Sequence, residues 1–116
     1  MSVVTGKVIR GKKEGTKLGF PTANIHFDGS LEPGIYTGYT SIEQDGEVES
    51  IIYIAGRTLE CHILDFPKQD LYDKQISVEL LHKIREVQEF SGSEEAIEQI
   101  EEDIQKAREW FKNRKN

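Results

Sequence analysis

The sequence has the size of one small domain and the composition of a globular protein. Its 116 residues are 36% hydrophobic and 31% charged, with a formal net charge of −6. This length suits one modest core rather than two, and the balance of residue types excludes an intrinsically disordered chain. No apolar run approaches the ~18 residues that a membrane span needs, and residues 1–10 lack a signal-peptide core. A single cytoplasmic domain over 1–116 is the expectation.

Strand patterns fill the chain up to about residue 90. Runs rich in β-branched and aromatic residues are separated by turn signals, among them Asp45-Gly46. Six strands with short connections suit a closed or nearly closed antiparallel barrel. The predicted strands are 3–10, 22–27, 35–42, 48–54, 59–64 and 76–84.

The last part of the chain changes to a helical period, which predicts a helix over about 92–112. Ser91 and Glu94 have the spacing of a capping box. Residues 94–109 hold seven acidic side chains against two basic ones. We interpret them as a solvated face, which would repel phosphates and so disfavours a nucleic-acid partner. The apolar stripe expected to pack on the barrel is Ile97, Ile100, Ile104, Ala107 and Phe111.

Positive charge gathers at residues 7–17, which hold five basic side chains against one Glu. Gly11 and Gly15 would let backbone N–H groups approach phosphate oxygens. The side chains that could neutralise these oxygens are Lys12, Lys13 and Lys17. A solvated hairpin loop explains the same composition, and the phosphate-loop pattern GxxxxGK[ST] is absent from the sequence.

Thr22 and Asn24 follow this loop and lie on one face of a predicted strand, because they are two positions apart. A hydroxyl and an amide oxygen are hard donors that suit Mg²⁺ carrying phosphate oxygens. The alternative is that both side chains only satisfy backbone groups after the turn at Pro21.

Glu60 and His62 share a face in the middle of an apolar strand. A carboxylate there can serve as the general base for a hydroxyl nucleophile. Periodicity equally allows the alternative that Glu60 and His62 are an outward-facing pair on the solvated side of the sheet. Glu79 competes for the role of base, but its strand neighbours indicate ordinary surface. Cys61 is interpreted as a buried strand thiol rather than a nucleophile. Basic loop, oxygen donors and carboxylate together match the needs of phosphoryl transfer to an alcohol.

Four segments carry a specific resemblance in one order over nearly the whole chain. They are GKVIRGKKEGTKLGFPTANI, GIYTGY, LECHILDFPKQDLYDKQISVELLHKIREVQEF and SEEAIEQIEEDIQKAREWF. The chain resembles the riboflavin kinase family, and in particular the flavokinase module that bacteria usually carry behind an FMN adenylyltransferase domain. That second domain is not part of this sequence, so FAD synthesis is not expected.

The resemblance implies a six-stranded Greek-key barrel that transfers the γ-phosphate of ATP to the 5′-hydroxyl of riboflavin, giving FMN. Thr22 and Asn24 match the motif that holds Mg²⁺ and the nucleotide phosphates. Glu60 matches the catalytic carboxylate. Gly11 and Gly15 fall in the loop that covers the phosphates, a loop that also contains Lys13 and Lys17. Arg85 lies where the family has a loop that closes over the flavin.

Two departures from the family pattern bear on function. Residues 55–58, AGRT, replace a longer family loop with a Gly-x-Asn-Pro element, and Asp73 stands where the family usually has Gly. Asp can adopt the left-handed turn that such a Gly would serve. Loss of the longer loop at 55–58 could remove one wall of the ligand site. The alternative function is therefore a non-catalytic flavin- or nucleotide-binding module. Small-molecule substrates and a monomer are expected, with no membrane partner.

Overall fold

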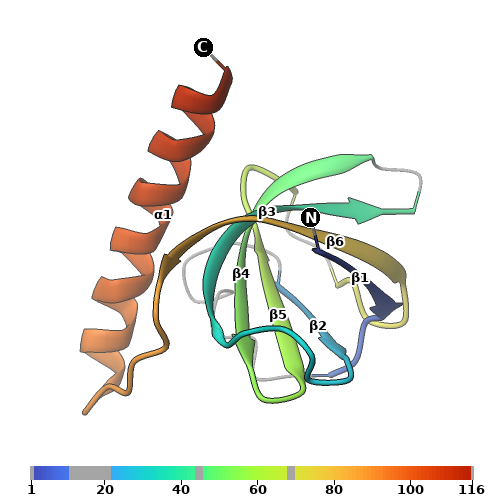
Figure 1. The fold of residues 1–116 in the computed structure, drawn as a ribbon, viewed down its shortest axis with the longest axis horizontal. Coiled ribbons are helices and arrows are strands. Elements are labelled where there is room, and N and C mark those ends of the chain that lie inside the picture. Colours follow the sequence, from blue (N-terminus) through green and yellow to red (C-terminus); the bar gives the residue numbers. More distant parts are fainter. Residues whose placement is uncertain (1, 11–21, 44–45, 68–69, 116) are drawn as a thin grey trace.

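Six strands and one helix make up the computed structural model, which describes residues 2–10, 22–43, 46–67 and 70–115 (Figure 1). Every predicted strand and the predicted helix are present, with ends shifted by at most three residues. Within the described residues, no helix is both long and apolar enough to cross a membrane. The elements are β1 (Ser2–Lys7), β2 (Thr22–His26), β3 (Gly34–Ile42), β4 (Glu47–Ala55), β5 (Thr58–Ile63), β6 (Gln75–Arg85) and α1 (Ser93–Lys115).

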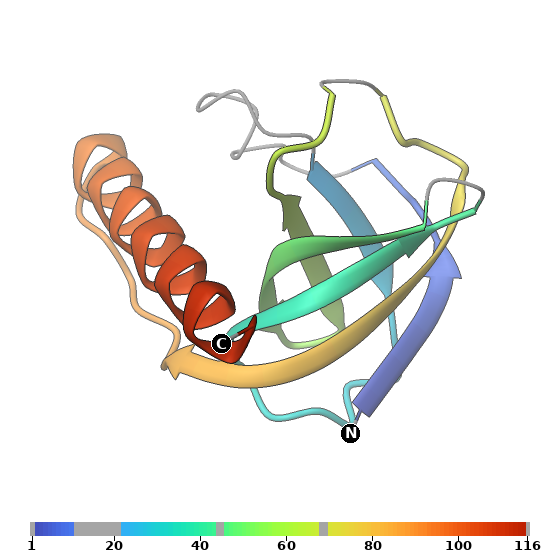
Figure 2. The same ribbon diagram turned by 90° about the horizontal axis from the view of Figure 1, so that it is seen from above.

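The strands form one antiparallel sheet in the order β1-β6-β3-β4-β5-β2. Because β3, β4 and β5 are successive neighbours and β6 returns beside β3, these four strands make a Greek key. The sheet curls round so that Ile9, just beyond β1, meets β2 through an N–H that donates to the Asn24 carbonyl at 2.8 Å. Figure 2 shows the resulting barrel from above, with α1 along one side. The predicted β-barrel with a C-terminal helix is therefore confirmed.

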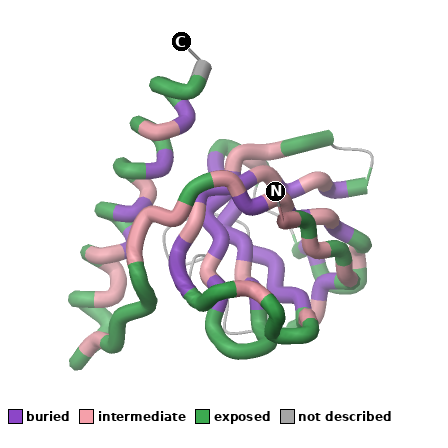
Figure 3. The backbone as a smooth tube through the Cα atoms, viewed as in Figure 1, coloured by how far each residue is buried: buried purple, intermediate pink, exposed green. Residues whose placement is uncertain are grey.

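Two apolar clusters hold the fold together. Successive strand residues point to opposite faces, so one set fills the barrel and the other meets the helix. The barrel interior includes Ile25, Ile52 and Cys61, none of them exposed. On the outer face, Ile51 packs with Ala107 and Phe111 of α1, as the helical stripe predicts. In Figure 3 the exposed residues of α1 lie on the side away from the barrel.

Two sequence predictions about α1 need correction. The backbone N–H of Ser91 donates to the Glu95 carboxylate at 3.4 Å. Glu95, rather than Glu94, therefore caps the backbone at Ser91 before the helix starts. The acidic residues are also not all solvated, because Asp103 is fully buried. It lies between Ile100 and Ala107 on the buried stripe, at the spacing that puts residues on one helical face.

The connection between β4 and β5 is a two-residue hairpin turn at Gly56 and Arg57, flanked by the Ala55–Thr58 pair. Gly56 has a φ of +61° at the first central position, as a type II′ turn requires. The tip of the preceding hairpin, including Asp45, lies outside the described residues. The AGRT segment is therefore a minimal turn that ends both strands together.

Asp73 has a φ of +72°, in the left-handed region. We expect Asp73→Gly to leave the free energy of unfolding within about 0.5 kcal/mol of the wild type, because its exposed ion pair with Lys7 contributes little. A β-branched side chain is strained there, so Asp73→Val should cost about 1–2 kcal/mol. Urea unfolding measures both, and equal stability of the two variants would show that backbone strain is not decisive at this turn.

Candidate functional site

A row of laterally paired residues crosses the outer face of the barrel. Asn24 of β2 pairs with Glu60 of β5, and Glu60 pairs with Tyr53 of β4. Tyr53 pairs with Ile35 of β3, which pairs with Arg85 of β6. Paired residues of neighbouring strands point to the same face and lie about 5 Å apart. This cross-strand row, Asn24–Glu60–Tyr53–Ile35–Arg85, joins predicted site residues that are far apart in the sequence.

Thr22 lies next to the cross-strand row. It pairs with His62, and this pair is two residues along β2 and β5 from the Asn24–Glu60 pair. Thr22 and Asn24 are buried, at 8% and 6% exposure. Among the described residues, neither Thr22 Oγ1 nor His62 Nδ1 has a hydrogen-bond partner, although both atoms are buried. Buried polar atoms are nearly always paired, so the Thr22 hydroxyl beside Asn24 is available to a polar ligand atom.

Glu60 is held on one side by His62, with 3.2 Å between Oε1 and Nε2. The His62 side chain is 1% exposed and the Glu60 side chain 18% exposed. The pair is therefore not on a solvated face, which was the alternative interpretation of this strand. The Tyr53 ring packs on the imidazole, with ring centroids 4.4 Å apart.

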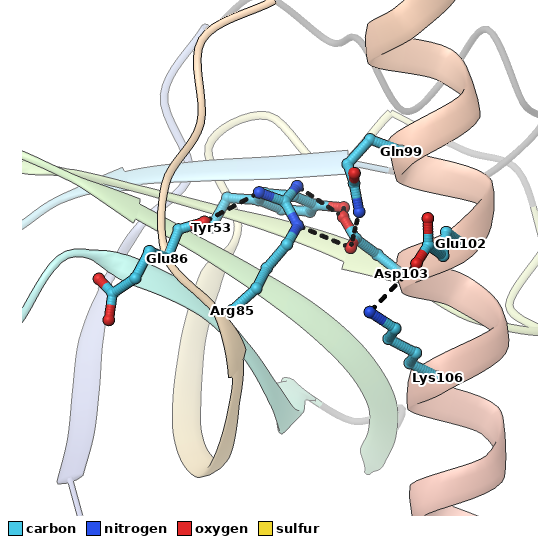
Figure 4. A network of polar contacts seen from close by, with 7 residues as sticks. All are labelled: Tyr53, Arg85, Glu86, Gln99, Glu102, Asp103 and Lys106. Atoms are coloured by element: carbon cyan, nitrogen blue, oxygen red, sulfur yellow. Dashed lines mark hydrogen bonds and ion pairs between the residues drawn. The ribbon is translucent and has the colours of Figure 1, made fainter.

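A polar network centred on the buried Asp103 lies at the other end of the cross-strand row (Figure 4). The Arg85 guanidinium donates from Nε and Nη2 to the two carboxylate oxygens of Asp103, each at 2.8 Å. The Tyr53 hydroxyl donates to Asp103 Oδ2 at 3.2 Å, and Gln99 Nε2 donates to Oδ1 at 3.1 Å. Burial and the neighbouring Asp103 raise the pKa of Tyr53 above its ordinary value, so this phenol stays protonated.

Arg85 therefore has two roles to reconcile. The family resemblance implies that Arg85 belongs to the flavin site. In the structure Arg85 lines a cavity, and its guanidinium is also the ion-pair partner of Asp103. The hydrogen bonds that Arg85 donates to Asp103 raise the pKa of the guanidinium, so it stays charged. Asp103 itself was missed at the level of sequence, although its place within the apolar stripe of α1 was a usable signal.

The cavity has a volume of about 350 Å³ and lies between the barrel and the start of α1. It is mainly apolar, and the cross-strand row leads into it through Tyr53. Ala55, at the short β4–β5 turn, is part of its wall, so the minimal turn leaves a pocket beside it. The lining residues are Ile35, Tyr53, Ile54, Ala55, Arg85, Val87, Gln88, Phe90, Ala96 and Ile100.

The predicted phosphate loop cannot be placed in this geometry. Gly11, Lys13, Gly15 and Lys17 lie outside the described residues. The described chain resumes at Thr22, at the end of the site where Thr22 and Asn24 lie.

Cys61 points into the barrel interior, away from Glu60, and is fully buried. Burial raises the pKa of its thiol to about 12. Only about one thiol in 10⁴ is then ionised near pH 8, and the thiolate is the reactive form. We expect Ellman's reagent to leave Cys61 unmodified in the folded protein and to react fully in guanidinium chloride. Rapid reaction of the folded protein would contradict its assignment as an inert core thiol.

The chain is similar to several known proteins over most of its length. Residues 2–111 match the family model described as Flavokinase, riboflavin kinase. A bifunctional riboflavin kinase/FMN adenylyltransferase of Haemophilus influenzae is 33% identical over 93% of this chain and 38% of its own length. The RNA-binding riboflavin kinase RibR of Bacillus subtilis is 33% identical over 90% of this chain and 49% of its own. The chain thus spans less than half the length of these relatives.

A solved structure shares the fold over nearly the same region. The crystal structure of a protein named macrolide-efflux protein from Streptococcus pneumoniae superposes with a TM-score of 0.79 at 26% sequence identity. The match covers 93% of this chain and 38% of that protein. The barrel with its terminal helix therefore recurs as one part of a longer chain.

Proposed function

The chain belongs to the riboflavin kinase family, and on that premise we propose that it transfers the γ-phosphate of ATP to the 5′-hydroxyl of riboflavin, giving FMN and ADP. The observation that carries the proposal is the cross-strand row. Its Asn24–Glu60–Tyr53 part connects oxygen donors, a carboxylate and a cavity on one face of the barrel. Phosphoryl transfer to an alcohol needs these three elements within reach of one another.

Thr22 and Asn24 would hold Mg²⁺ together with the phosphates of ATP. The residues fit this role, because both offer uncharged oxygen donors on one face and the Thr22 hydroxyl is buried without a partner among the described residues. A bound Mg²⁺ would neutralise part of the negative charge on the transferring phosphate. The loop with Gly11, Lys13, Gly15 and Lys17 would cover the nucleotide phosphates, as its sequence indicates.

Glu60 would accept the proton of the ribityl 5′-hydroxyl as that oxygen bonds to the γ-phosphorus. The bond between the γ-phosphorus and the bridging oxygen breaks, and ADP leaves. Asn24 pairs with Glu60 across the strands, so a base at Glu60 would lie beside the predicted phosphate end. General-base assistance of this kind contributes roughly 10²–10⁴-fold to a rate.

The cavity would take the flavin ring, since ligand pockets are mainly apolar with a few placed polar groups. Its walls offer Phe90, Val87 and Ile100 for apolar contact, and the edge of Arg85 for a polar one. The ribityl chain would then run along the cross-strand row from Tyr53 towards Glu60. We also propose a monomer, since the apolar stripe of α1 is covered by its own barrel. The same proposal includes a cytoplasmic location and no nucleic-acid partner, because the acidic residues of α1 would repel phosphates.

Incubation of the chain with riboflavin, ATP and Mg²⁺, followed by chromatography of the flavins, tests this function. We expect FMN and ADP in equal amounts, and no FMN when ATP is left out or EDTA removes the metal. Protein that is folded by circular dichroism but forms no FMN would refute the kinase. The short β4–β5 turn favours one other candidate, a binding module, for which riboflavin fluorescence would be quenched on titration without product.

A further inference from the structure

We infer that His62 is a positioning residue for Glu60, which rests on the proposed role of Glu60 as the base. His62 is two residues beyond Glu60 on β5 and points to the same face. Its Nε2 lies 3.2 Å from Glu60 Oε1. A carboxylate can only accept in this contact, so Nε2 carries the proton and donates it.

This hydrogen bond orders the base. A free Glu side chain samples several rotamers, and fixing it lowers the entropy that is lost when the reacting groups align. With Oε1 occupied by His62, Oε2 is the oxygen left to take the substrate proton. His62 therefore acts through Glu60 and need not touch the substrate.

The imidazole is itself held firmly. Its side chain is 1% exposed, and the Tyr53 ring packs against it at 4.4 Å. The Tyr53 hydroxyl is anchored to Asp103 of α1, as Figure 4 shows. A continuous set of contacts thus runs from α1 through Tyr53 and His62 to Glu60, so the orientation of the base depends on the docked helix.

His62 is not explained by packing alone. A leucine or methionine would fill a buried strand position at lower cost, because His62 Nδ1 has no hydrogen-bond partner among the described residues. A buried imidazole with one unsatisfied nitrogen costs stability, and the nitrogen that is satisfied is the one that faces Glu60.

Steady-state kinetics of two matched variants test this role. His62→Leu keeps a similar volume without a donor, and we expect kcat to fall roughly 10- to 100-fold while KM for riboflavin and ATP changes little. His62→Gln places an amide N–H near the position of Nε2, so it should recover most of that loss. In a Glu60→Gln background, His62→Leu should lower kcat no further. Unchanged kcat in His62→Leu, equal loss in both variants, or a loss confined to KM would overturn the inference.

A measurement that does not depend on turnover separates this inference from the proposed function. ¹⁵N correlation spectra of the histidine rings, with the His62 signals assigned by their loss in His62→Leu, report which nitrogen carries the proton. We expect a protonated Nε2 at His62 whose shift moves in Glu60→Gln. An unprotonated Nε2, or a ¹⁵N chemical shift of His62 that is unchanged in Glu60→Gln, would overturn the inference. If the wild type forms no FMN, the kinase proposal fails, and these spectra still decide whether His62 holds Glu60.

Discussion

Asp103→Asn is expected to destabilise the fold by about 1–3 kcal/mol, because it leaves the partly buried Arg85 guanidinium without its counter-charge. Asp103 is fully buried and accepts from Arg85, Tyr53 and Gln99. No other carboxylate among the described residues is recorded within salt-bridge distance of Arg85. Urea unfolding followed by far-UV circular dichroism and by Trp110 fluorescence measures the loss.

Glu102→Gln is the matched control, since it makes a comparable change one residue earlier on α1. Glu102 is exposed, and its only recorded ion pair among the described residues is with Lys106 at 3.2 Å. Exposed pairs of this kind contribute little, so we expect a change below about 0.5 kcal/mol. A loss below about 1 kcal/mol in Asp103→Asn would mean that water replaces the carboxylate and that the pair does not secure the helix.

Glu60→Gln is expected to lower kcat for FMN formation by roughly 10²–10⁴-fold, because the amide has the shape of the carboxylate but cannot accept the substrate proton. KM for riboflavin should change little, since the cavity is lined by other residues. A fall in kcat with an unchanged KM identifies a group that acts only in the transition state. The measurement is initial rate against substrate concentration, by chromatography of the flavins.

Glu79→Gln is the control for this change, since it alters another strand carboxylate in the same way. Glu79 lies on β6 and pairs with Val3 and Tyr39, away from the cross-strand row. We expect its kinetics to match the wild type. If Glu79→Gln loses the activity and Glu60→Gln keeps it, the base has been assigned to the wrong strand.

Much of the fold is readable from local patterns. Alternation in 76–84 predicts β6, because a strand that buries one face against the core has a period of two. The stripe from Ile97 to Phe111 predicts α1 and its buried side, because 3.6 residues complete a turn. The end of β1 is less predictable. Its β-branched run continues to Ile9, but regular pairing with β6 stops at Lys7, opposite Gln75, where β6 begins.

The site is readable as a set of residue types and not as a geometry. Thr22, Asn24 and Glu60 can be named from motif and chemistry, yet their adjacency depends on the register between β2 and β5. A shift of that register by one residue would put their side chains on opposite faces. The burial of Asp103 has the same origin, because it depends on Arg85, 18 residues earlier on another element.

The sequence by itself determined the element types, the family resemblance and the candidate oxygen donors and base. Only the tertiary structure decided that the residues of the cross-strand row meet, that Asp103 is buried, and that a cavity remains beside the minimal turn at Gly56. The physical reason is the range of the interactions. Turn, strand and helix patterns arise from neighbours in the chain, whereas register, burial and cavities arise from packing between segments that are distant in sequence.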